Sequence, residues 1–83
     1  MIAIFVHSVA SEFNWPIEQY IVDVPDIDDP NNWRFSTDRA EAKLFESLND
    51  ALDFYFQRSA RMQTRPDGMP NRPLTAYTIL LQE

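Results

Sequence analysis

WRFSTDRAEAKLFESLNDALDFYF, residues 33–56, is the stretch that decides the fold class of this chain. Its second half predicts an amphipathic helix that begins at Leu48. Ser47 suits the N-cap, and Asp50 lies three positions later, where the helix dipole favours a carboxylate. One face of this helix is expected to carry Leu48, Ala51, Leu52, Tyr55, Phe56, Ser59 and Met62. Pro66 and Gly68 then stop the helix.

The segments around the helix read as strands. Residues 2–9 are apolar on both alternating faces, which is typical of a central strand. Residues 18–24 and 75–82 predict two further strands. Residues 40–45 fit either a strand, which we prefer, or a helix capped by Ser36 or Thr37. We therefore predict an α+β fold: a small antiparallel sheet of three to four strands with one amphipathic helix on one face.

Size and composition predict a single domain over residues 1–83. The hydrophobic fraction is 45% and the chain has no cysteine, so we expect a folded cytoplasmic protein without disulfides. No apolar run reaches the roughly 20 residues of a membrane-spanning helix, and the N-terminus does not resemble a signal peptide.

One helix covers only one face of a sheet, yet the first and last strands are apolar on both faces. The loops that carry Trp15 and Trp33 are one candidate cover for the second face. A second copy of the chain or another protein is the other candidate, and a homodimer through this face is therefore expected as an alternative.

Charge is distributed unevenly along the chain, whose net charge is −6. No Lys or Arg precedes Arg34, whereas arginines are frequent after residue 57. This asymmetry favours a partner selected by electrostatics. The acidic residues expected to bind that partner are Asp23, Asp26, Asp28 and Asp29. The alternative is that these carboxylates pair with arginines of the same molecule.

The sequence contains no motif typical of the common catalytic, metal-binding or cofactor-binding sites. His7 is the only histidine, and residues 26–37 lack the Gly and Glu that an EF-hand calcium loop requires. With Gly68 as the only glycine, a phosphate-binding glycine-rich loop is excluded. We expect no metal site, no cofactor and no enzymatic activity.

Phe54 is predicted to lie about 120° from the centre of the apolar helix face. Arg58, Arg61 and Arg65 follow it at helical spacing. An aromatic residue among arginines suits a partner-binding surface, and it could also stack a nucleobase. The acidic net charge makes direct nucleic-acid binding the weaker interpretation. The alternative is that Phe54 packs beneath the 64–74 loop while the arginines are solvated.

Two resemblances rest on short motifs. Trp33 to Ala51, W-x-x-S-T-D…A-x-A-K-x-F-x-S-x-x-D-A, resembles a pattern in small bacteriophage and bacterial proteins of unknown function, which implies a phage or mobile-element setting. VDVPDI at residues 22–27 and S-x-x-D-A-L at residues 47–52 are similar to HicB-type antitoxins. That second resemblance implies a partial RNase H-like fold and a regulatory role.

The sequence therefore supports three hypotheses in order. The first is a non-enzymatic acidic protein that binds and inhibits a host protein, such as a nucleic-acid-handling complex; in size and acidity the chain is similar to some anti-CRISPR proteins. The second is a dimeric antitoxin or regulatory subunit. The third is a nucleic-acid binder that uses Phe54 and the arginines.

Overall fold

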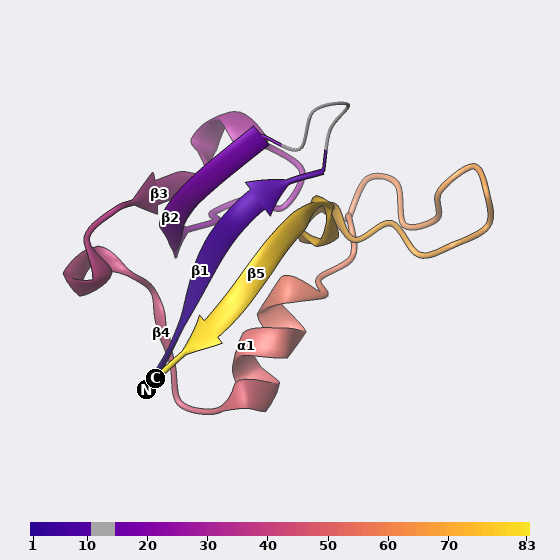
Figure 1. Cartoon of the computed structure of the whole chain (residues 1–83). Helices are drawn as coiled ribbons and strands as arrows, with labels where there is room; N and C mark the ends of the chain where they lie inside the picture. Colours follow the sequence, from indigo (N-terminus) through magenta and orange to yellow (C-terminus); the bar gives the residue numbers. More distant parts are fainter. Residues whose placement is uncertain (11–14) are drawn as a thin grey trace.

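The computed structural model describes residues 1–10 and 15–83. Within these residues, an antiparallel sheet of five strands carries one α-helix (Figure 1). Strand β1 (Ile2–Val9) is central, between β2 (Trp15–Asp23) and β5 (Tyr77–Gln82). β3 (Arg34–Ser36) pairs with β2, and β4 (Leu44–Phe45) pairs with the start of β1. The α+β class is confirmed, with more strands than the predicted three to four.

The strand bounds differ from the predicted ones where tertiary contacts intervene. β3 was not expected, because three residues are too few for a periodic pattern and the strand exists by pairing with β2. Residues 40–45 divide between the two interpretations: a 3-10 turn at Arg39–Glu41 precedes the short β4. Two further 3-10 turns lie at Pro30–Asn32 and Pro73–Ala76, and the second delays the start of β5.

Helix α1 (Leu48–Tyr55) begins as predicted but is shorter. The hydroxyl of Ser47 accepts the N–H of Asp50 at 3.1 Å, which confirms the predicted N-cap. The prediction that the helix extends to Met62 is wrong, because the chain leaves helical geometry at Phe56. No proline or glycine stands at that point, so the helix end is set by contacts of the following segment.

The core lies between α1 and one face of the sheet. Ile2, Ile4 and Val6 of β1 point to this face and are buried together with Ile21, Phe45 and Ala51. Trp33 is buried beside Tyr77, at 6.1 Å between ring centroids, and its Nε1 donates to the carbonyl of Asp26. Because Tyr77 packs against the same core cluster, Trp33 covers the helix side of the sheet.

The opposite face of the sheet carries no α-helix among the described residues, although the guanidinium of Arg39 lies over the Tyr20 ring, 5.9 Å from its centroid. Leu80, Phe5 and Tyr20 lie opposite one another across β5, β1 and β2 on this face, and Leu80 is 56% exposed. The expectation that the Trp33 loop covers this face is therefore wrong. The same expectation for Trp15 concerns a side chain outside the described part. The loop predicted over residues 11–16 falls on undescribed residues up to 14, and its last two residues, Trp15 and Pro16, belong to β2.

In the described ranges 1–10 and 15–83, no helix has the length and apolar character needed to cross a membrane.

Candidate functional site

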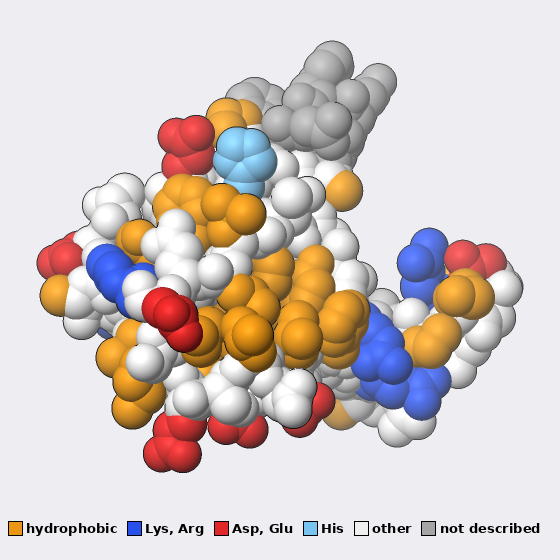
Figure 2. Space-filling view, turned by 60° about the horizontal axis from the view of Figure 1, so that its bottom comes forward, with side chains coloured by type: hydrophobic (Ala, Val, Ile, Leu, Met, Phe, Trp, Pro, Cys, Tyr) orange, Lys and Arg blue, Asp and Glu red, His pale blue; other side chains and the backbone are white. Residues whose placement is uncertain are grey.

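A projecting segment, residues 57–72, is the most distinctive surface feature of the molecule, and we name it the arm (Figures 1 and 2). Its two sides are joined by backbone hydrogen bonds from Ser59 to Asn71 and from Asn71 to Gln63, at 2.8 and 2.9 Å. A tight turn closes the tip, where Arg65 donates to Met69 at 2.8 Å and Gly68 adopts a φ of +86°. Glycine suits that position because other residues are strained there.

Asp28 anchors the arm to the body of the protein. Its carboxylate accepts the hydroxyl of Ser59 and the backbone N–H groups of Ala60 and Arg61, the latter two at 2.8 and 3.1 Å. The Ser59 hydroxyl is the main cause that lowers the pKa of Asp28 below its usual value; partial desolvation opposes it, and the two N–H groups reinforce it. Asp28 thus fixes the base of the arm as a deprotonated acceptor.

Arg72 closes the base of the arm from the other side. Its guanidinium donates to the carbonyl of Phe56 and lies 5.7 Å from the centroid of the Phe56 ring. That carbonyl belongs to the C-cap of α1, where a cation is favourable. Asp28 and Arg72 therefore explain why the chain turns away from the helix here.

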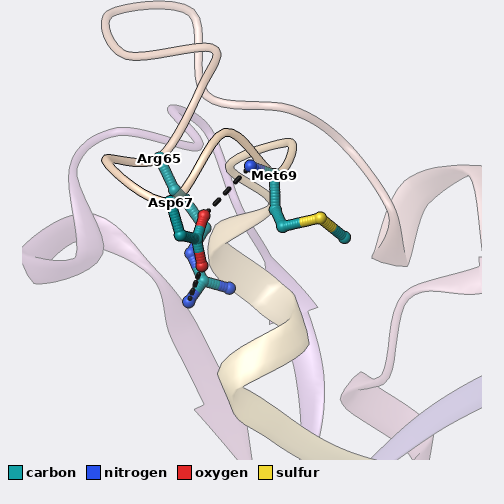
Figure 3. Close-up of polar contacts among 3 residues, drawn as sticks. All are labelled: Arg65, Asp67 and Met69. Carbon is teal, nitrogen blue, oxygen red and sulfur yellow. Dashed lines mark hydrogen bonds and ion pairs between the residues drawn. The ribbon is translucent and has the colours of Figure 1, made fainter.

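The arm is held in shape by hydrogen bonds of its backbone and of a few side chains, and every side chain from Ala60 to Met69 is exposed. Met62 and Met69 are 57% and 59% exposed. The guanidinium of Arg65 pairs with Asp67 at 3.2 Å, while the Met69 side chain points away from that pair (Figure 3). Arg58 donates to the carbonyl of Gln63 at 3.2 Å and stays exposed, as does Arg61. The result is an ordered hairpin that displays arginine and methionine.

The net charge of the arm is opposite in sign to that of the rest of the chain. It carries four arginines against one aspartate, a net charge of +3, so the rest of the chain carries −9 within the total of −6. The arginine side chains in Figure 2 continue from the body along the projecting segment. An open cleft of about 430 Å³ at the base of the arm is lined partly by Arg65 and Arg72. This arrangement suits anionic side chains of a partner.

The predicted acidic residues come together only in part. Asp28 is occupied by the arm, so the acidic and arginine-bearing regions do meet, through hydroxyl and backbone donors. Asp26 accepts the N–H of Asp28 at 2.9 Å, and Asp29 accepts the side chain of Asn32 at 2.5 Å, both within their own turn. Asp23 lies at the end of β2 and is partly exposed.

Phe54 and the arginines do not share a helix face. Because α1 ends at Tyr55, Arg58, Arg61 and Arg65 lie on the arm. Phe54 packs on the core, with its ring centroid 5.1 Å from that of Phe45. Its position was predicted wrongly because the expected apolar face included Leu48 and Phe56, which are exposed at the borders of the short helix. The packing interpretation holds, against Phe45 instead of the 64–74 loop.

The sequence reasoning missed three features of this surface: the anchoring role of Asp28, and the exposure of Met62 and Met69. Asp28 and Ser59 are 31 positions apart, so no local pattern indicates their contact. Met62 and Met69 lie on either side of Pro66 and Gly68. These two turn-forming residues were the available signal that both methionines belong to an exposed loop. Among the described residues, no group of three or more His, Asp or Glu side chains is placed to hold a metal ion.

The chain matches no protein-family model, no curated protein and no solved structure.

Proposed function

We propose that this chain is a non-enzymatic domain that binds and inhibits another protein, and that the arm is its main contact surface. The proposal rests on one observation: within residues 57–72, the groups that hold the arm in shape are different from the side chains that it exposes. Backbone groups and Asp28 hold the arm in shape, while Arg58, Arg61, Met62 and Met69 are left exposed. An ordered loop loses little conformational entropy on binding.

The exposed side chains are of the types that dominate protein interfaces. Arginine and methionine are enriched at interface cores, and arginine is frequent among hot-spot residues. We infer that the arm contacts a partly apolar surface with carboxylates, against which guanidinium groups can form paired hydrogen bonds.

The remaining surface carries a net charge of −9 and would face a basic region of the same partner. A nucleic-acid-handling protein in the bacterial cytoplasm, the setting implied by the phage-like motif, offers such a basic region. In this proposal Asp23, Asp26 and Asp29 steer association, whereas Asp28 acts only by holding the arm. Occupying the nucleic-acid site of the partner would be the means of inhibition.

The test is capture from bacterial lysate with the tagged chain and with an arm variant, Arg61→Ser/Met62→Ser/Met69→Ser. All three residues are exposed, so the variant should fold normally. The matched control is Arg34→Ser/Leu44→Ser/Leu48→Ser, which removes one arginine and two exposed apolar residues elsewhere. We expect one stoichiometric protein with the wild type and the control, and at least a tenfold loss with the arm variant.

A second step tests inhibition. The captured protein, once purified, should bind its nucleic acid less tightly when the wild-type chain is added, and the arm variant should lack this effect. Equal capture by the arm variant and the wild type would refute the role of the arm. Capture without any effect on nucleic-acid binding would refute the inhibitory role.

A further inference from the structure

Strand β5 is an unpaired edge of the sheet. In an antiparallel strand the N–H and C=O groups of successive residues point alternately to the two sides. Ala76 points toward β1, because its carbonyl accepts the N–H of Ala10 at 2.6 Å. Tyr77 points outward, because its carbonyl accepts the hydroxyl of Tyr55 at 2.6 Å. By the same alternation, the backbone groups of Ile79 and Leu81 point outward, and within the described part of the chain no hydrogen bond reaches them.

This edge lacks the devices that usually protect one. Edge strands are typically short, charged, bulged or covered. At the opposite edge, β3 has three residues and begins with Arg34. β5 has six residues, YTILLQ, none of which is charged or proline, and the irregularity of its pairing with β1 lies in β1 between Val6 and Ser8. Apart from the Tyr55 hydroxyl at the Tyr77 carbonyl, the described residues place no hydrogen bond on this edge, and an edge of this kind is a template for pairing with another strand.

We propose that β5 pairs with β5 of a second copy of this chain, antiparallel, with Leu80 opposite Leu80 on the two-fold axis. In this register Ile79 faces Leu81 of the second copy. The outward groups of both residues then form two hydrogen-bonded pairs. Shifting the axis to Ile79 would bring the 3-10 turn at Pro73–Ala76 into the pairing, and shifting it to Leu81 would shorten the overlap. The Leu80 register thus uses the strand most fully.

The register is also self-complementary in its side chains. Thr78 faces Gln82 of the second copy, so two polar groups meet. Glu83 is the one charged residue beside the strand, and it faces Tyr77 of the second copy. No like charges stand opposite one another, although each chain carries a net charge of −6.

Pairing would also bring together the sheet faces that carry Leu80. Leu80, Phe5 and Tyr20 already form a row across three strands, with Phe5 and Tyr20 rings 5.2 Å apart in an edge contact. The second copy would continue this row from Leu80 onward, and the two exposed leucines would cover each other. Figure 2 shows hydrophobic side chains gathered in a continuous band on the body, between acidic groups and the base of the arm.

A single cysteine tests the register, because the chain has none of its own. Residues opposite each other in a pair without hydrogen bonds have Cα atoms about 4.5 Å apart, within the range of a disulfide. Leu80→Cys should therefore form a covalent dimer quantitatively with oxidised glutathione, which accepts the two electrons and two protons from the two thiols. Thr78→Cys is the matched control: it lies on the same face of β5 but faces Gln82 of the second copy, so it should cross-link poorly.

Sedimentation of the unmodified chain provides the second measurement. We expect the wild type to be a dimer at high micromolar concentration and Leu80→Lys to be a monomer, because the substitution places two like charges on the axis. Leu80 is exposed in the monomer, so the fold of the monomer should be unchanged. A monomeric wild type, with equally slow cross-linking of both cysteine variants, would overturn the proposal even if the edge binds a strand of another protein. Arm-dependent capture is read separately and does not depend on this result.

Discussion

The hydroxyl of Ser59, a side chain only 2% exposed, donates a hydrogen bond to the carboxylate of Asp28, which lies 31 positions earlier in the chain. The same carboxylate accepts two backbone N–H groups at the start of the arm. An acidic turn that reads from sequence as a solvated binding surface therefore has one member that organises a distant loop. This contact fixes the base of the arm to the body, while hydrogen bonds within residues 57–72 join its two sides.

Replacing Asp28 should loosen the arm. Asp28→Asn keeps one acceptor oxygen but loses the charge that strengthens all three hydrogen bonds. We expect trypsin to cut after Arg58 and Arg61 several times faster than in the wild type, whereas the bond after Arg65 resists trypsin because Pro66 follows it. Asp29→Asn is the control, since it removes the same charge from the same turn without touching the arm. Equal cleavage rates for the two variants would show that Asp28 is not the anchor.

Acid should weaken the same contact. The pKa of Asp28 lies below its usual 3.8 in the folded chain, first because the Ser59 hydroxyl donates to the carboxylate. A lowered folded pKa stabilises the protein above the unfolded pKa, and this stabilisation is lost as the pH falls through the folded value. The difference in Tm between the wild type and Asp28→Asn should therefore be constant near neutral pH and shrink below about pH 4. A difference that persists unchanged into strong acid would contradict this assignment.

Helix α1 has eight residues, so its N-cap contributes a large share of its stability. Ser47→Ala removes the acceptor for the N–H of Asp50 and should lower the free energy of unfolding by about 1 kcal/mol. In a domain of this size that corresponds to a Tm lower by about 4–8 °C in thermal unfolding. The control Asn49→Ala changes an exposed residue of the same turn and should leave Tm nearly unchanged.

Phe54 should behave as a core residue. Phe54→Ala removes its contact with Phe45 and should cost roughly 2–3 kcal/mol in unfolding free energy by chemical denaturation, below the usual range because Phe54 is only half-buried. Leu48→Ala, at a position 54% exposed on the same helix, should cost less than about 0.5 kcal/mol. Full stability of Phe54→Ala would contradict the core position of Phe54 and would favour a role of Phe54 in partner binding.

The contrast between Ser47 and Phe56 shows how far the sequence could predict this fold. Ser47 and Asp50 form a local cap, which is readable because both partners lie within one turn. The helix end at Phe56 depends on Arg72 and, through Ser59, on Asp28, and such distant contacts leave no local signal. β3 escaped prediction for the same reason, since its three residues are a strand only beside Ile21 and its neighbours.

In the candidate site too, local features could be predicted from the sequence and features that depend on distant contacts could not. The basic character of Arg58, Arg61 and Arg65 was readable from composition, but their placement on a hairpin was not, because the helical spacing of apolar residues continues past Tyr55 in the sequence. An apolar pattern records which residues prefer burial, and it does not record which long-range contact ends an element.

We propose that Asp28 holds the arm of the free protein in the shape that binds the partner. Backbone ¹⁵N relaxation measures this order, because it reports on each amide of residues 57–72 other than Pro66 and Pro70. We expect order parameters of about 0.8 along the arm in the wild type, close to those of β1, and a fall toward about 0.6 or less in Asp28→Asn. An arm that is already flexible in the wild type, or equally ordered in both proteins, would contradict the account.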